Sequence, residues 1–148
     1  MRLSALDASH LAALVALEGI VGSGVSDHLL SGALNSSTNH VLGLFVDDAL
    51  VGYALIARQP FDAELQAIGV APGRRGMGLG VRLMAGVIEI AQAWQSERLL
   101  LEVRASNTAA QALYRRFDFS QDGRRKGYYA APGLTGERED AVLMSRGV

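Results

Sequence analysis

One stretch, from Leu65 to Trp94, restricts what this chain can fold into more than any other. It opens with an apolar run at residues 65–70 that is typical of a strand, and Pro72 ends it because proline has no N–H to donate to a sheet. From Val81 to Trp94 apolar residues recur at steps of three and four, which predicts a helix with one buried face. A glycine-rich turn, residues 73–80, connects the two.

This turn carries glycine at positions 73, 76, 78 and 80, where the helix is expected to begin. Glycine loses much backbone entropy on folding, so four of them need a structural reason. Anion binding is one, because a chain without Cβ atoms lets a ligand approach the unpaired N–H groups at the positive end of the helix. Arg74 and Arg75 add positive charge, so a diphosphate is the predicted ligand. The alternative is a flexible connection.

Two familiar phosphate-binding loops do not fit these letters. The dinucleotide pattern G-x-G-x-x-G fails, because a third glycine counted from Gly76 and Gly78 falls on Val81. A Walker loop fails as well, because Leu79-Gly80 stands where Lys-Ser/Thr is required. Hydride transfer and nucleotide hydrolysis are therefore disfavoured.

Composition narrows the remaining classes of function. With 148 residues, we expect a single domain over 1–148. The chain has no cysteine, which excludes disulfides and an acyl-cysteine intermediate, and its three histidines lack metal-ligand spacing, so we expect no metal. A net charge of −1 argues against direct nucleic-acid binding. No membrane segment or signal peptide is expected, and a cytoplasmic location follows.

The other elements before residue 65 are predicted from local pattern and turn residues. They are a strand over Arg2–Leu6; a helix capped by Asp7, carrying Leu11, Leu14, Val15 and Glu18 and ended by Gly19, Gly22 and Gly24; a short helix including 28–30 and Leu34, closed by 35–39; and a hairpin of Val41–Val46 and Leu50–Arg58 around Asp47-Asp48.

The elements after residue 94 are predicted in the same way. They are a strand over Arg98–Val103; a helix opened by Ser106 and Asn107, with Thr108 and Gln111 at capping-box spacing, ending near Asp118; a strand over Phe119–Arg125; a loop over Gly127–Gly136; and a strand over Asp140–Met144. Strands alternating with helices, and an antiparallel hairpin at each end, predict an α/β fold of three layers with a mixed sheet.

Two side chains are candidates for proton transfer. Glu102 interrupts an apolar strand, so it lies either on a solvated edge or in a cleft, where it acts as a base. Tyr114 follows Leu113 on the next helix, and an aromatic residue at that spacing is by default packed in the core. Its hydroxyl still needs a hydrogen-bond partner, which makes Tyr114 the candidate proton donor.

Several of these segments together resemble the motifs of the GCN5-related N-acetyltransferases (GNAT family), in the family's order. They are Ile68-Gly69-Val70, the turn Arg75–Gly80, Leu101-Glu102-Val103-Arg104-x-x-Asn107, Ala112–Tyr114 and Asp118-Phe119. The resemblance implies a single-domain α/β fold with a mixed, mostly antiparallel sheet flanked by helices on both faces. It also implies acetyl-CoA as the acetyl donor, without a metal.

The resemblance carries family roles onto individual residues. The backbone of the turn would hold the pyrophosphate, Asn107 would contact the cofactor, and the amides of the splayed strand would contact the acetyl carbonyl. The cofactor-binding residues implied are Ile68, Gly69, Val70, Arg75, Gly76, Met77, Gly78, Leu79, Gly80 and Asn107. Glu102 would be the general base and Tyr114 the general acid, for direct attack by an amine.

Within the family, the chain is more similar to the bacterial ribosomal-protein-alanine N-acetyltransferases, the RimI type. Shared segments are Leu101–Asn107, Arg125-x-x-Tyr128-Tyr129 and Arg138–Ala141. This implies the N-terminal alanine of a small-subunit ribosomal protein as acceptor, entering beside Tyr128, Tyr129 and the loop that follows them.

Three departures from the pattern stand beside this resemblance. Asp118 replaces a glycine, Gly69 stands where alanine is common, and Gly22–Ser26 replaces a Pro-Trp-Ser segment on the expected acceptor side. Two other functions stay open: a small-amine or lysine acetyltransferase of the same fold, and a non-catalytic acyl-CoA sensor. The tyrosine pair also has a plain alternative, as packing for the last hairpin.

Overall fold

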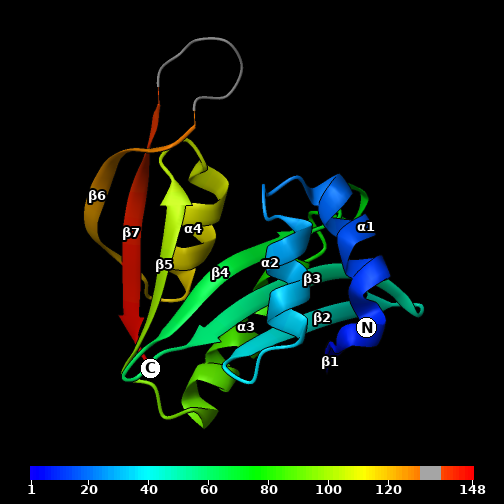
Figure 1. Ribbon diagram of the computed structural model, residues 1–148. Helices are drawn as coiled ribbons and strands as arrows, with labels where there is room; N and C mark the ends of the chain where they lie inside the picture. Colours follow the sequence, from blue (N-terminus) through cyan, green and yellow to red (C-terminus); the bar gives the residue numbers. More distant parts are fainter. Residues whose placement is uncertain (131–137) are drawn as a thin grey trace.

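The computed structural model describes residues 1–130 and 138–148. Its strands form one sheet in the order β1-β2-β3-β4-β5-β7-β6, antiparallel at each described pairing except that of β4 with β5 (Figure 1). In chain order the elements are β1 (Arg2–Ala5), the 3-10 turn η1 (Ala8–His10), α1 (Leu11–Val21), α2 (Asp27–Leu34), β2 (Asn39–Val46), β3 (Ala49–Arg58), β4 (Ala63–Val70), the 3-10 turn η2 (Pro72–Arg74), α3 (Leu79–Ala93), β5 (Arg98–Arg104), α4 (Thr108–Arg116), β6 (Ser120–Tyr129) and β7 (Glu139–Gly147).

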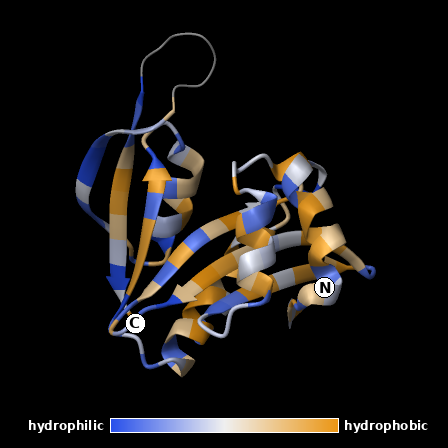
Figure 2. Cartoon of the chain, in the orientation of Figure 1, coloured by the Kyte–Doolittle hydropathy of each residue, from blue (hydrophilic) through white to orange (hydrophobic). Residues whose placement is uncertain are grey.

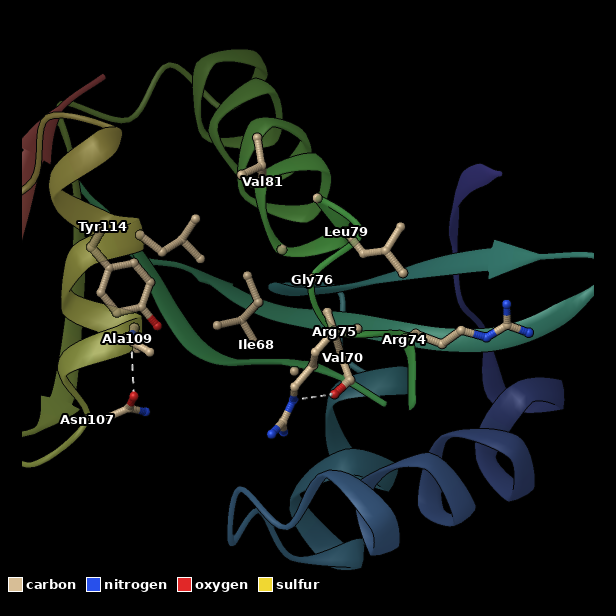
Figure 3. Close-up of a pocket in the computed structure, with 15 residues that line it drawn as sticks. Ile68, Val70, Arg74, Arg75, Gly76, Leu79, Val81, Asn107, Ala109 and Tyr114 are labelled. Carbon is tan, nitrogen blue, oxygen red and sulfur yellow. Dashed lines mark hydrogen bonds between the residues drawn. The ribbon is translucent and has the colours of Figure 1, made fainter. Parts of the chain in front are cut away.

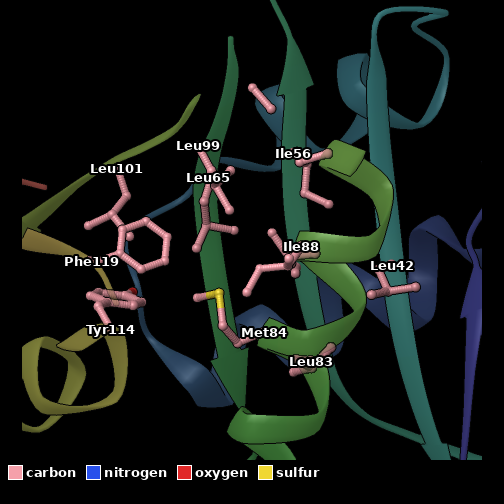
Figure 4. Packing of buried hydrophobic residues seen from close by; sticks show 14 of the residues in the cluster. Leu42, Ile56, Leu65, Leu83, Met84, Ile88, Leu99, Leu101, Tyr114 and Phe119 are labelled. Atoms are coloured by element: carbon pink, nitrogen blue, oxygen red, sulfur yellow. The ribbon is translucent and has the colours of Figure 1, made fainter. Parts of the chain in front are cut away.

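Helices cover the sheet on both faces. Ile56 of β3 packs into the same buried cluster as Leu83 and Met84 of α3, and Figure 4 shows these side chains meeting between helix and strands. Its neighbour Leu55 belongs to a second cluster, shared with Leu14 of α1. Alternate strand residues point to opposite faces, so a strand buried on both faces is apolar along its length, as β3 is (Figure 2). The predicted three-layer α/β fold is confirmed.

The N-terminal elements form where they were predicted, with two corrections. Asp7 caps the 3-10 turn η1, accepting from the Ser9 N–H at 2.9 Å, and α1 begins only at Leu11. Gly19 does not end this helix, which continues to Val21 and stops at Gly22 in the left-handed region (φ 71°). A left-handed residue ends a helix by turning the chain, and Gly22 adopts that conformation directly after Val21. Gly24 also has a positive φ, 93°, but it lies beyond the end of the helix.

The predicted hairpin and the central helix are confirmed. Asp47 and Asp48 both have positive φ, 49° and 63°, the backbone of a tight two-residue turn between β2 and β3. α3 starts two residues earlier than the periodicity indicated, at Leu79, because Gly78 serves as its N-terminal cap.

The predicted capping box of α4 is wrong. Asn107 is the cap, and its side-chain Oδ1 accepts from the Ala110 N–H at 3.1 Å. Gln111 is instead buried and donates to the carbonyls of Arg104 and Ala105, which ties the helix to the end of β5. Asp118, which stands where the family pattern has glycine, adopts the left-handed conformation, with φ 67°.

The last hairpin is longer than predicted. β6 extends to Tyr129, so Gly127, Tyr128 and Tyr129 lie in a strand rather than a loop, and β7 runs from Glu139 to Gly147. Residues 131–136 of the predicted loop fall outside the described residues. The tyrosine pair is therefore held by a sheet.

β4 changes partners along its length, and this opens the sheet. Its described pairing with β5 ends at Leu65 with Leu101. At the same place Ile56 pairs with Leu65 but Leu55 with Ala67, so Gln66 is an extra residue, a β-bulge. A bulge bends the strand that contains it. β4 and β5 consequently diverge toward their C-terminal ends as the arms of a V (Figure 1), as expected for a strand splayed at residues 68–70.

None of the helices in residues 1–130 and 138–148 combines the length and apolar character needed to cross a bilayer. The cytoplasmic location and the single domain expected from composition stay predictions.

Candidate active site

A cavity of about 500 Å³ lies where the V opens, between the start of α3 and α4. Such a volume lies within the range typical of small-molecule sites. Figure 3 shows its walls: the end of β4 with Ile68 and Val70, the turn before α3 with Gly76, the start of α3 with its first residue Leu79, and α4 with Tyr114. The segments singled out in the sequence, 68–70, the glycine turn, Asn107 and Tyr114, thus come together at one place.

The glycine turn presents its backbone to this cavity. Gly76 and Gly78 have φ of 81° and 75°, a conformation that side-chain-bearing residues rarely adopt. In the described part of the chain, the N–H groups of residues 76–81 have no backbone acceptor, because the first helical bond runs from Arg82 to Gly78. These free donors at a helix N-terminus fit a diphosphate.

The three long side chains of the turn, Arg74, Arg75 and Met77, differ in how they lie relative to the cavity. Arg75 donates from Nε to the Val70 carbonyl at 3.3 Å, so its guanidinium stays beside the end of β4 (Figure 3). Arg74 also lines the cavity, although its guanidinium extends away from Tyr114. Met77 is the exception among the predicted cofactor residues, since its side chain is 57% exposed and lies outside the cavity wall.

The departure at Gly69 has a tertiary reason. A Cβ at this position would lie 2.5 Å from Cγ1 of Val21, at the end of α1, a distance that real side chains do not reach. Glycine is thus required because α1 approaches the strand closely. The splay itself comes from the bulge at Gln66 rather than from Gly69.

Tyr114 is buried to 6% exposure, its ring packed 5.8 Å from that of Phe119. Its hydroxyl has no hydrogen-bond partner among the described residues, and Tyr114 lines both this cavity and a second one. Burial, with a smaller contribution from Tyr129, raises the pKa of Tyr114 to about 12. The side chain is therefore both part of the core and a protonated donor at the junction of two cavities.

The second cavity lies on the α1 and α2 side of the V and is wider, about 740 Å³. Its walls are residues 21–26 after α1, strand residues 64–69 and 102–104, and the tyrosines of β6. Glu102 belongs to this wall, so the sequence alternative of a cleft is the one realised. Its side chain is 31% exposed, and Oε1 lies 3.1 Å from Nη2 of Arg125.

The tyrosine pair also lines this second cavity. Arg125 lies over the Tyr128 ring at 4.7 Å, and Arg104 lies over the Tyr129 ring at 4.4 Å. The rings themselves meet edge to face, 5.0 Å between centroids. Burial raises the pKa of Tyr129, with a further contribution from the Glu102 carboxylate. These contacts fix the tyrosines as part of the cavity wall.

Sequence reasoning missed a buried polar group beneath the loop after α1. Glu18 is 6% exposed and accepts from the Tyr53 hydroxyl at 2.7 Å, the Ser23 hydroxyl at 2.6 Å and the Gly24 N–H at 3.2 Å. It thereby anchors residues 22–24, which line the second cavity. The available signal was its position one turn after the buried Leu14, on the apolar face of α1.

Comparison with known proteins agrees with this geometry. A sequence model of the acetyltransferase (GNAT) family matches residues 12–119. The chain belongs to this family. The crystal structure of the ribosomal-protein-S18-alanine N-acetyltransferase from Escherichia coli superposes with a TM-score of 0.90 at 28% identity, covering 99% of this chain and 93% of that one. The ribosomal-protein-alanine N-acetyltransferase of Brucella melitensis gives 0.80 at 25% identity, with both chains fully covered.

Relatives in sequence carry the same kind of name within the GNAT family. The N-alpha-acetyltransferase RimI of Mycobacterium tuberculosis is 40% identical over 117 residues, 76% of this chain and 69% of that protein. The ribosomal protein bS18-alanine N-acetyltransferase of Salmonella typhimurium is 36% identical over 104 residues, 70% and 68% of the two chains. A Mycobacterium leprae relative, 41% identical over 117 residues, is longer, and the match spans 30% of its length.

Proposed function

We propose that this protein is an acetyl-CoA-dependent N-acetyltransferase acting on the N-terminal alanine of a small-subunit ribosomal protein. The observation that carries the proposal is the meeting of two cavities at Tyr114, in the V between β4 and β5. One cavity presents free backbone donors to a diphosphate, and the other brings Glu102 toward an amine. Two substrates entering from opposite faces of a sheet can react only where such an opening exists.

The donor side fits acetyl-CoA through its backbone. The free N–H groups of residues 76–81 would bind the diphosphate, and Arg75 would add positive charge beside it. Asn107 uses its Oδ1 to cap α4, which leaves its side-chain NH₂ as a donor toward the cavity. When bound, acetyl-CoA supplies the reactive thioester.

The chain's own groups account for the proton transfers. Glu102, directly or through one water, takes a proton from the attacking amine as the C–N bond forms. Backbone N–H groups at residues 68–70 that face away from β3, on the side of β4 that has left β5, would hydrogen-bond the acetyl oxygen. As the C–S bond breaks, Tyr114 gives its proton to the departing sulfur, and its raised pKa keeps the hydroxyl protonated until that step.

A protein N-terminus suits the acceptor side better than a compact amine. The second cavity is lined from α1 across the sheet to β6, long enough for several residues of extended chain. A terminal α-amine has a pKa of about 7.7–8.0, against about 10.4 for lysine, so it loses a proton to a carboxylate more readily. The names of the relatives from S. typhimurium and E. coli support alanine of a ribosomal protein as the specific acceptor.

A peptide panel tests this proposal. With acetyl-CoA as donor, a short peptide with a free N-terminal alanine should gain one acetyl group by mass, and its N-formylated copy should gain none. A lysine peptide with a blocked N-terminus should react poorly. Robust acetylation of the blocked lysine peptide, or of a polyamine in preference to all peptides, would move the protein to the small-amine or lysine class. Binding of acetyl-CoA without thiol release on any amine would identify a sensor.

A further inference from the structure

The Glu102 carboxylate is held by a side chain from two strands away. Arg125 belongs to β6, and β7 lies between it and β5 in the sheet. The residue of β7 in register with Arg125 is Ala141, which is also in register with Arg104 of β5. Its methyl group leaves room for a long side chain to cross β7, and Nη2 of Arg125 reaches Oε1 of Glu102 at 3.1 Å.

The other side of this guanidinium rests on an aromatic ring. Cζ of Arg125 lies 4.7 Å from the centre of the Tyr128 ring, within the range of a cation–π contact. Arg125 is therefore fixed between a carboxylate and a ring, which explains in physical terms why an arginine stands three residues before this tyrosine. A neighbouring trio, Arg104 over Tyr129 with Glu139 at 3.6 Å, repeats the arrangement.

The ion pair joins Nη2 of Arg125 to Oε1 of Glu102. None of the described residues donates a hydrogen bond to Oε2 of Glu102. Such a partly exposed ion pair adds little to folding stability. It does remove rotational freedom from the carboxylate, and it leaves the second oxygen available in the acceptor cavity.

We propose that Arg125 is a positioning residue for Glu102 and that Tyr128 holds Arg125 in place. This inference rests on the proposed role of Glu102 as the base. Arg125 fixes the direction in which the free oxygen points, and so the geometry of proton removal from the amine. A proton-transfer group must lie within hydrogen-bond reach of its proton, so loss of this support lowers turnover without changing the binding of acetyl-CoA.

A double-mutant cycle on the full chain, with the alanine peptide as acceptor, separates positioning from structural support. Arg125→Gln should lower kcat about 10-fold and leave the KM for acetyl-CoA unchanged. In a Glu102→Gln background, the same change should cost less than about 2-fold, because there is no base left to position. The proposal would be overturned if Arg125→Gln lowered kcat by the same factor, about 10-fold, in the Glu102→Gln background as in the wild type.

Conservative variants give a second, independent reading if Glu102→Gln is too slow to assay. Arg125→Lys keeps the charge without the planar fork, so its kcat should lie between those of the wild type and Arg125→Gln. Tyr128→Phe keeps the ring under the guanidinium, so it should lower kcat less than Tyr128→Leu, which removes the ring. Equal defects in Lys and Gln, together with equal effects of Phe and Leu, would contradict the assignment.

Arg124 provides the matched control. It is the adjacent residue of β6 and pairs with Asp140 at 3.3 Å, and the two pairs have similar exposure, 49% and 28% against 52% and 31%. Arg124→Gln should leave kcat unchanged. If the wild type acetylates the peptide but Arg124→Gln and Arg125→Gln behave alike, positioning fails while the function stands; if the wild type acetylates no N-terminus, the proposed function fails first.

Discussion

Glu102 and Tyr114 occupy contrasting surroundings although both face the opening of the sheet. Glu102 lies in the wall of the wider cavity with a partly exposed side chain and a cationic partner, Arg125. Tyr114 is enclosed by the core, beside Phe119, with its hydroxyl directed to where the cavities meet. An exposed carboxylate and a buried phenol suit opposite tasks, because burial favours the protonated form of a phenol.

At this scale the prediction concerns Tyr114→Phe. The variant should fold as the wild type does, since the ring stays, and should lose about 10²–10⁴-fold in kcat. Because the pKa of Tyr114 is raised to about 12, its hydroxyl keeps its proton at every pH well below that value. The ratio of wild-type to variant kcat should therefore be constant from about pH 7 to 10, as steady-state assays across that range will measure.

Two results would contradict this assignment. If Tyr114→Phe kept full turnover, the tyrosine would be a core residue and no more. If the wild-type rate fell steeply between about pH 8 and 10 while the variant's did not, the hydroxyl would be losing its proton far below the pKa expected from its burial. Calorimetric affinity for acetyl-CoA serves as the control and should match in both proteins.

At the scale of elements, the turn before α3 combines glycines of positive φ with N–H groups that have no backbone acceptor among the described residues. Gly76 and Gly78 need glycine because of positive φ, whereas Gly73 has an ordinary φ and open space around it. The spacing of these glycines predicted the turn, because the need for glycine at a positive φ depends only on the local backbone. Spacing alone did not distinguish Gly73 from the other glycines of the turn, whereas the family resemblance left Gly73 out of the cofactor-binding residues.

Gly78→Asp should weaken acetyl-CoA binding by at least about 10-fold, measured by calorimetry. It places a carboxylate and a strained backbone at the N-terminus of α3, where the free amides would meet the diphosphate. Gly73→Asp is the matched control: it adds the same charge to the same turn but lies outside the cavity wall, and we expect its affinity to stay within a few-fold of wild type. Unchanged affinity in a folded Gly78→Asp variant would place the diphosphate elsewhere.

At the scale of the whole molecule, the site depends on layers meeting across the sheet. The bulge at Gln66 turns β4 away from β5, and α1 then packs so closely on the turned strand that Val21 fills the space of a side chain at Gly69. The buried Glu18 and Tyr53 pair joins the same helix to the centre of the sheet. The second cavity is therefore bounded by α1, which packs closely on β4.

Gly69→Ala should lower the free energy of unfolding by ~1–3 kcal/mol, measured by urea denaturation, because the new methyl group overlaps Val21. The cost should be smaller in a Val21→Ala background, where that space is free. Gly19→Ala, within α1 and with nothing near its Cβ, is the control and should be neutral or stabilising. An equal cost with and without Val21 would show that the contact is not what requires glycine.

The sequence by itself determined the features that depend on neighbours along the chain. The apolar periodicity gave α3, the aspartate pair gave the β2–β3 turn, and the alternation of strands with helices gave the α/β class. The resemblance of the motifs to GNAT enzymes gave the family and brought Glu102, Asn107 and Tyr114 forward as candidates. The Thr108–Gln111 capping box was predicted wrongly because the same sequence pattern also allows Asn107 to be the cap. Gln111 instead donates to the carbonyls of Arg104 and Ala105, which leaves Asn107 as the cap.

Only the tertiary structure decided how residues distant in sequence meet. Whether Glu102 faced solvent or a cleft depended on where β4 leaves β5, and that position is set by a bulge in the register with β3. The reason for Gly69 lies 48 residues away in Val21, and the partner of Glu102 is Arg125, two strands across. Periodicity encodes which face of an element is buried, but register and layer spacing emerge only when the elements pack, because both are properties of pairs of segments.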